Sequence, residues 1–132
     1  MRNTIYANYQ GIEYSAGIKE DGNIVLRSGD VNDIQKGFFE KKISDNSIYL
    51  KYVSPRDIDE IYDKRVFAKY KGYRFEVIDE KENEISILIM TGDYREWLKL
   101  GMTQIDKGVY QKWISKDEAE INVEKKSLKE EL

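Results

Sequence analysis

The side chains that could carry out chemistry in this sequence are carboxylates, lysines and tyrosines, because cysteine and histidine are both absent. Without cysteine there is no thiolate nucleophile, no disulfide and no zinc-thiolate site. Without histidine the commonest general base and most transition-metal sites are lost. What remains is acid-base chemistry by carboxylates, binding of hard cations by Asp and Glu, and a lysine nucleophile.

Two carboxylates stand at similar places in the two halves of the chain, where Asp30 and Asp93 each follow a glycine. Such a pair could bind a hard cation or exchange a proton. Asp is also a favoured cap for a turn or short helix, and we expect that role for both residues. The chain has no phosphate-cradling glycine loop, nucleophile elbow or spaced metal ligands. The sequence therefore predicts no enzyme, no metal and no cofactor.

Acidic residues cluster in two further places, and either cluster could simply be a solvated face. The sharper interpretation is a surface complementary to a cationic partner, such as an enzyme that holds nucleic-acid phosphates. Aromatic side chains next to such a surface would serve as anchors, although burial of Trp97 against the helix is the favoured alternative. The predicted partner-binding residues are Asp57, Asp59, Glu60, Asp63, Glu80, Glu82, Glu84, Tyr94 and Trp97.

Tyrosines interleave with basic residues in Tyr70, Lys71, Tyr73 and Arg74, a combination from which a surface for single-stranded nucleic acid could be made. Lys41, Lys42, Lys51 and Lys112 extend the basic set. Against this interpretation, several of the tyrosines recur in equivalent places and are better explained as core residues.

Composition favours one compact domain. The chain has 132 residues, with 22 Lys and Arg against 25 Asp and Glu, a net charge of −3 and 40% hydrophobic residues. That length and apolar content suffice for a single core. No apolar run is long enough for a membrane span or a signal peptide, so we expect a cytoplasmic protein without a membrane partner.

The chain matches itself at an offset of 61 residues, which indicates an internal repeat. We place the repeats at about 5–66 and 67–128, with a frayed tail at 129–132. The matching sets are Ala7, Tyr9, Gly11 and Tyr14 with Ala68, Tyr70, Gly72 and Phe75, and Tyr49, Lys51, Tyr52, Val53 and Ser54 with Tyr110, Lys112, Trp113, Ile114 and Ser115.

Each repeat is predicted to hold a hairpin, a helical turn and two further strands. The hairpins are expected over 12–28 and 73–91, the helical turns over 31–36 and 94–100, and the later strands near 38–42, 48–53, 102–106 and 109–114.

A helix is then expected to close each repeat. Ser54 as N-cap and Pro55 at the first helical position predict the start of a helix, in which Ile58, Ile61 and Tyr62 would share one face. In the second repeat Ser115 and Glu118 have capping-box spacing, yet residues 116–127 also alternate as a strand would, and only the repeat favours the helix.

These elements predict an α+β fold, a single compact domain made of a tandem pseudo-twofold repeat of four antiparallel strands plus one helix. With Tyr9-Gln10-Gly11 matching Tyr70-Lys71-Gly72, and the repeated Gly-Asp pairs, this order resembles the Whirly arrangement. It is also similar to small immunity proteins encoded beside bacterial polymorphic or contact-dependent growth inhibition toxins.

The resemblance implies a bacterial immunity protein that binds and neutralises a cognate toxin, a cationic nuclease, by occluding its active site, as a monomer or homodimer. Two other classes stay open. One is a single-stranded nucleic-acid-binding module that uses aromatic and basic sheet faces, and the other is an adaptor with a different protein ligand.

Overall fold

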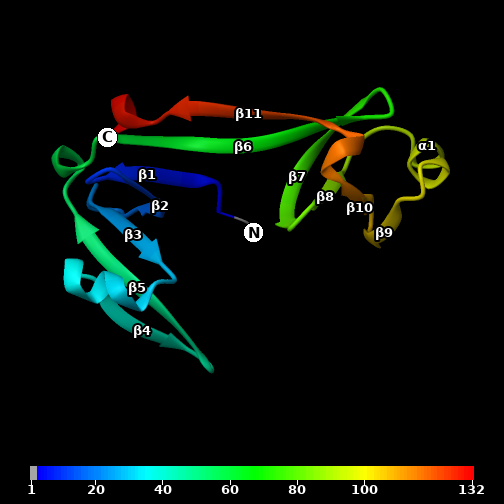
Figure 1. Ribbon diagram of the computed structural model, residues 1–132. Coiled ribbons are helices and arrows are strands. Elements are labelled where there is room, and N and C mark those ends of the chain that lie inside the picture. Colours follow the sequence, from blue (N-terminus) through cyan, green and yellow to red (C-terminus); the bar gives the residue numbers. More distant parts are fainter. Residues whose placement is uncertain (1–2) are drawn as a thin grey trace. The chain divides into compact units, whose positions relative to one another are not determined.

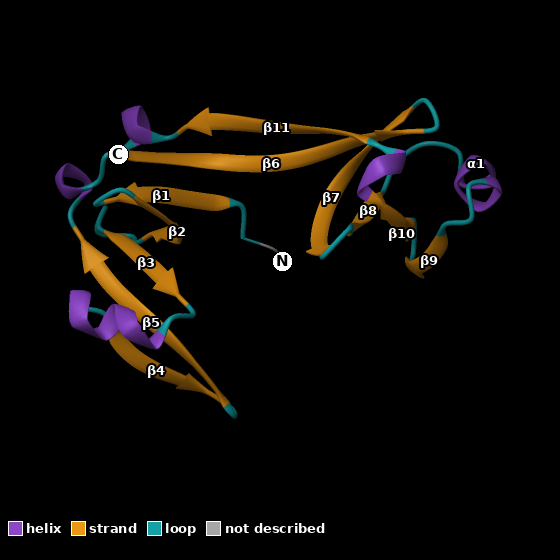
Figure 2. Ribbon diagram, viewed as in Figure 1, coloured by secondary structure: helices purple, strands orange, loops and turns teal. Residues whose placement is uncertain are grey.

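The computed structural model describes residues 3–132, and antiparallel strands dominate it (Figure 1). Within these residues eleven strands form one hydrogen-bonded sheet: ten follow the order β4-β5-β3-β2-β1-β6-β7-β8-β10-β9, and β11 pairs with β6 outside that path. The one α-helix, α1 (Tyr94–Lys99), has six residues, and the other helical segments are short 3-10 turns (Figure 2).

The chain divides into two compact units. Unit 1 comprises residues 1–64 and 125–132. Its elements are β1 (Ile5–Tyr9), β2 (Ile12–Ile18), β3 (Ile24–Ser28), the 3-10 helix η1 (Val31–Lys36), β4 (Phe39–Ile43), β5 (Asn46–Val53), η2 (Pro55–Asp57), the first part of β6 (Glu60–Tyr70), the end of β11 and η4 (Lys129–Glu131).

Unit 2 comprises residues 65–124 and repeats the same order of elements. The last part of β6 takes the place that β1 has in unit 1, and β11 takes the place of β6. After β6 come β7 (Tyr73–Lys81), β8 (Glu84–Ile89), α1, β9 (Thr103–Asp106), β10 (Val109–Ser115), η3 (Lys116–Glu118) and finally β11 (Glu120–Ser127).

The predicted α+β class, with a helix closing each repeat, is wrong. After Ser54 the chain makes only the three-residue turn η2, the Ser54 side chain caps nothing, and β6 follows. Ile61 is paired with Ala7 and lies in the unit 1 core, whereas Tyr62 is paired with Tyr6 on the opposite face. Because both faces of β6 are buried at Ile61 and Tyr62, the apolar residues there imitate helical spacing.

Residues 116–127 are likewise a 3-10 turn and a strand. Ser115 and Glu118 form the expected capping box, but the turn ends at Glu118 and β11 begins at Glu120. The alternation seen in the sequence was therefore the better guide for this segment, since successive side chains of a strand point to opposite faces.

A lysine ties the sheet to the end of the short helix in each unit. In unit 1 the Lys51 ammonium donates to the Lys36 carbonyl over 2.8 Å and lies 5.0 Å from the centre of the Tyr9 ring. In unit 2 the Lys112 ammonium donates to the Leu100 carbonyl over 2.7 Å. A positive charge is favoured at a helix C-terminus, where carbonyls lack partners inside the helix.

The opposite end of each short helix has an aspartate cap, as the sequence predicted. An Asp30 carboxylate oxygen accepts from the Asn32 amide over 2.9 Å, and Asp93 accepts from the Arg95 amide over 3.0 Å. These bonds satisfy amides that have no partner within the helix. The capping explanation for both aspartates is confirmed.

The core of unit 2 depends on Gly92 because Trp97 packs directly against it. Trp97 is 4% exposed, contacts Phe75 edge-on with ring centres 5.4 Å apart, and donates its indole N–H to the Thr91 carbonyl over 2.9 Å. A Cβ added at Gly92 would lie 2.6 Å from a Trp97 ring carbon, and the φ of Gly92 is +90°. Both the space and the backbone angle require glycine at this position.

We predict that Gly92→Ala lowers the free energy of unfolding by about 2–4 kcal/mol, from left-handed strain together with overpacking. Gly72→Ala is the matched control, because Gly72 has a φ of +85° but open space around its Cβ position. Gly72→Ala should lower the free energy of unfolding by only about 1–2 kcal/mol. Urea denaturation followed by tryptophan fluorescence measures both, and equal losses would contradict the proposed clash.

Candidate functional site: an acidic end of unit 2

Exposed carboxylates converge at one end of unit 2 from two separate segments of the chain. One segment is the turn between β7 and β8, and the other is η3 after β10. The β8–β10 register pairs Ser115 with Glu84, and the Lys116 amide donates to the Asn83 carbonyl over 2.8 Å. We call this set the acidic end; it consists of Glu80, Glu82, Glu84, Asp117 and Glu118, all exposed.

The lysines near the acidic end are already engaged. The Lys116 ammonium lies 3.2 Å from a Glu80 carboxylate oxygen, and the Lys81 ammonium lies 4.3 Å from the centre of the Trp113 ring. Among the described residues, neither Glu82 nor Glu84 forms an ion pair. Five carboxylates are therefore accompanied by two lysines, which leaves a local excess of negative charge facing solvent.

Trp113 supplies an aromatic surface beside these charges. Its neighbour Ile114 is 2% exposed and belongs to the unit 2 core, so strand alternation places Trp113 on the opposite, outer face of β10. It is half-buried and paired with Ser86. A tryptophan within a charged rim is typical of the residues that anchor protein interfaces.

The structure places the second predicted acidic set in unit 1, around the start of β6. Asp57, Asp59 and Glu60 are exposed, and Asp63 is half-buried. Lys129, predicted to lie in a frayed tail, donates its ammonium to the Asp59 carbonyl over 3.1 Å. It also donates to the Ile58 carbonyl over 3.2 Å, so this cation lies on the backbone of the unit 1 acidic segment.

The two aromatic residues predicted as anchors have different surroundings. Tyr94 is 55% exposed on α1, whereas Trp97 is buried and belongs to the unit 2 core. α1 lies against Tyr73 at the start of β7, and Glu80 stands near the end of that strand. A strand rises about 3.3 Å per residue, so roughly 20 Å separates Tyr73, next to α1, from Glu80 at the acidic end. The structure does not bring these predicted residues together.

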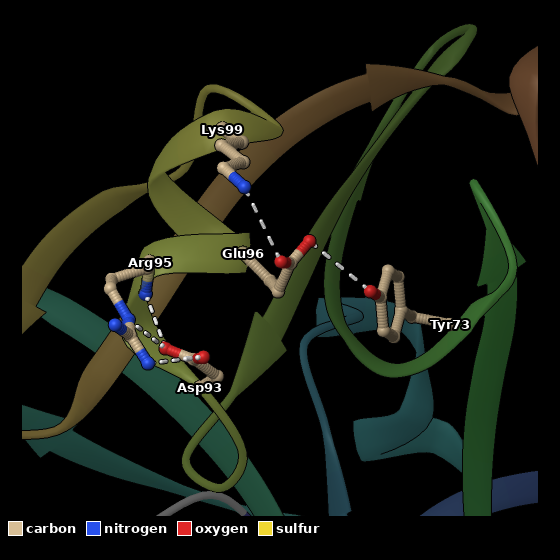
Figure 3. Close-up of polar contacts among 5 residues, drawn as sticks. All are labelled: Tyr73, Asp93, Arg95, Glu96 and Lys99. Carbon is tan, nitrogen blue, oxygen red and sulfur yellow. Dashed lines mark hydrogen bonds and ion pairs between the residues drawn. The ribbon is translucent and has the colours of Figure 1, made fainter.

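The charges around α1 are locally paired (Figure 3). The Arg95 guanidinium donates to both carboxylate oxygens of Asp93 over 3.1 Å, and the Lys99 ammonium lies 3.6 Å from Glu96. Hydrogen bonds from the Arg95 side chain and amide hold the pKa of Asp93 below its ordinary value. The negative charge of Glu96 raises the pKa of Tyr73, whose hydroxyl donates to Glu96 over 3.3 Å.

Three of the basic and aromatic residues predicted for a nucleic-acid surface are occupied inside the units. Tyr70 is 3% exposed, and the Lys112 ammonium lies 3.2 Å from its hydroxyl while donating to Leu100. Lys51 is committed to the Lys36 carbonyl. These three side chains stabilise the units and are not available as a stacking or phosphate-binding surface.

One family model matches residues 1–131, and its description is Uncharacterised conserved protein UCP033725. The chain belongs to this family. No curated protein and no solved structure matches the chain. The family description names neither toxins nor immunity proteins.

Within residues 3–132 no group of three or more acidic side chains is arranged to hold a metal ion. Over the same residues, no helix has both the length and the apolar character needed to cross a membrane. The chemistry that the acidic end does offer is charge-based recognition.

For α1 we predict that Arg95→Ala moves the titration midpoint of the Asp93 carboxylate up toward its ordinary value. The folded pKa is lowered, so the stability that this carboxylate contributes is present above its unfolded pKa and is lost as pH falls through the folded pKa. Lys99→Ala, which removes a smaller influence, should shift the midpoint less. Carboxyl NMR titration provides the measurement, and an unmoved midpoint in Arg95→Ala would refute the assignment.

Proposed function

We propose that this protein is a bacterial immunity protein that binds a cognate toxin through the acidic end and neutralises it by occluding its active site. The observation that carries the proposal is the meeting of carboxylates from β7–β8 and η3 at one exposed end, with Lys81 and Lys116 already engaged. Such an inhibitor needs a rigid scaffold, a charged rim and an aromatic anchor, and no catalytic group.

A nuclease is the class of toxin that this charge distribution favours. Enzymes that hold nucleic-acid phosphates present lysine and arginine side chains to them. Carboxylates on an inhibitor can engage the same cations, which accelerates encounter and blocks the path of the substrate. Glu82 and Glu84 fit this role best, because neither is neutralised by a cation of the described chain.

Trp113 is the proposed anchor within the acidic rim. Its ring already carries the Lys81 ammonium on one side, which shows that a cation can be accommodated there. An arginine or lysine of the toxin could replace Lys81 over the ring. In such interfaces the rim charges mainly set the association rate, whereas the buried anchor sets the dissociation rate.

We predict that the double substitution Glu82→Lys with Glu84→Lys lowers affinity for the toxin at least tenfold, chiefly through slower association, and abolishes protection of toxin-producing cells. The toxin to test is the product of the neighbouring gene, co-purified with the full chain. Surface plasmon resonance at two salt concentrations gives the rates, and the wild-type association rate should fall as salt rises.

Glu20→Lys with Glu40→Lys is the control, because both residues are exposed in unit 1 and the change in net charge is the same. It should leave association close to wild type. Equal weakening by the two double variants would show a general charge effect and reject the acidic end. Failure of the full chain to bind or neutralise the neighbouring product would reject the immunity function.

A further inference from the structure

The outer face of the unit 1 sheet carries an exposed aromatic pair on neighbouring strands. Phe39 of β4 is paired with Leu50 of β5, and Tyr52 lies two residues further along β5. The two rings have centres 5.5 Å apart and are 44% and 52% exposed, while Leu50 is 8% exposed. The aromatic pair is therefore an accessible layer above a buried sheet residue.

Basic side chains surround this pair on the same face. The Lys19 ammonium lies 4.3 Å from the centre of the Tyr52 ring. Arg27 is paired with Leu50, and its guanidinium lies 2.7 Å from the position that a Cβ would take on Gly17, so it extends across the open sheet surface there. Lys41 is exposed and two residues from Phe39 on β4. We call Lys19, Arg27, Phe39, Lys41 and Tyr52 the aromatic-basic patch.

Acidic side chains contribute little to this patch. Asp21 lies 3.8 Å from the Lys19 ammonium in an exposed pair. Glu40 is adjacent in sequence to Phe39 but is paired with Tyr49, whose side chain belongs to the unit 1 core, so strand alternation directs Glu40 to the opposite face. Glu13 lies on the same face, two residues from the Ser15 partner of Arg27, but its carboxylate is engaged by the Lys64 ammonium at 2.7 Å. The three cations therefore give the patch a local positive charge although the chain as a whole is negative.

Unit 2 provides an internal comparison. Trp113 occupies the place of Tyr52 at the offset of 61 residues, and its ring also carries a lysine at 4.3 Å. There, however, Glu84 is opposite Lys81 in the β7–β8 register and lies on the same outer face as the Trp113 ring, next to the rest of the acidic end. The same lysine-aromatic arrangement is therefore set in opposite electrostatic surroundings in the two units.

The geometry points to the aromatic-basic patch as a binding surface for single-stranded nucleic acid. Exposed rings on a sheet offer stacking platforms for unpaired bases, and interleaved lysine and arginine side chains bind the phosphates between them. A polyanion with planar bases matches both features of the patch, the charge and the rings. None of its residues belongs to the acidic end, so this surface is independent of toxin binding.

The test measures binding of a fluorescein-labelled oligothymidylate of about 12 nucleotides, a length typical of such surfaces, to the full chain by fluorescence anisotropy. We expect affinity to fall as salt rises from about 50 to about 200 mM. Tyr52→Leu and Phe39→Leu keep an apolar cover over Leu50 but remove the rings, and each should weaken binding about tenfold. Circular dichroism verifies that the variants are folded.

Lys41→Gln and Lys42→Gln form a matched pair on β4. Both lysines are exposed, but Lys41 lies on the patch face and Lys42 on the opposite face. Only Lys41→Gln should weaken binding and reduce the salt dependence by the equivalent of about one phosphate contact. Equal effects of the two substitutions, or no effect of either ring removal, would overturn the proposal.

Two further results would also overturn it. The first is the absence of oligonucleotide binding at the lower salt concentration. The second is concentration-dependent self-association in sedimentation that Tyr52→Leu abolishes, because the patch would then be an interface between copies of the chain. Neither result bears on toxin neutralisation, which is measured with the acidic-end variants.

Discussion

The lysine that joins the sheet to the short helix is the interaction on which the rest of each unit depends. Lys51 and Lys112 both lie on the core face of a strand. The ammonium of each lies near a tyrosine ring and donates to a carbonyl at the C-terminal end of the short helix. Each ammonium also occupies the space beside a left-handed glycine, Gly37 or Gly101, where a Cβ would approach it to 3.2 Å. The helix is therefore fixed at both ends, by an aspartate cap and by a cation.

The core faces are committed in this way, and the two units differ on their outer faces. Unit 1 has Tyr52 among basic side chains, and unit 2 has Trp113 beside the acidic end. Tyr52 and Trp113 occupy equivalent positions, but Phe39 is matched by Thr103 in unit 2, and the charged residues around the rings also differ. Changes confined to an outer face are the kind that alters a partner without altering a fold.

Local patterns predicted the local structure well. The hairpins and the aspartate caps are confirmed, as are the helical turns predicted over 31–36 and 94–100, the second of which ends at Lys99. The helix expected after Ser54 is wrong, because Ile61 and Tyr62 are buried on opposite faces of one strand and a single-sequence pattern cannot separate that from a helical stripe.

The candidate site was predictable only in part. Glu80, Glu82 and Glu84 are adjacent in sequence, so their clustering was visible. Their proximity to Asp117 and Glu118 follows from the β8–β10 register, and no local signal specifies that pairing.

Unit 1 is closed by residues from the other end of the chain. Leu128 packs on its core, and the Leu128 amide donates to the Ile61 carbonyl over 2.9 Å. The ribosome synthesises the residues of unit 2 before Leu128. The unit 1 core therefore stays partly exposed until unit 2 has been synthesised. The first half to be translated is thus the last that can finish folding.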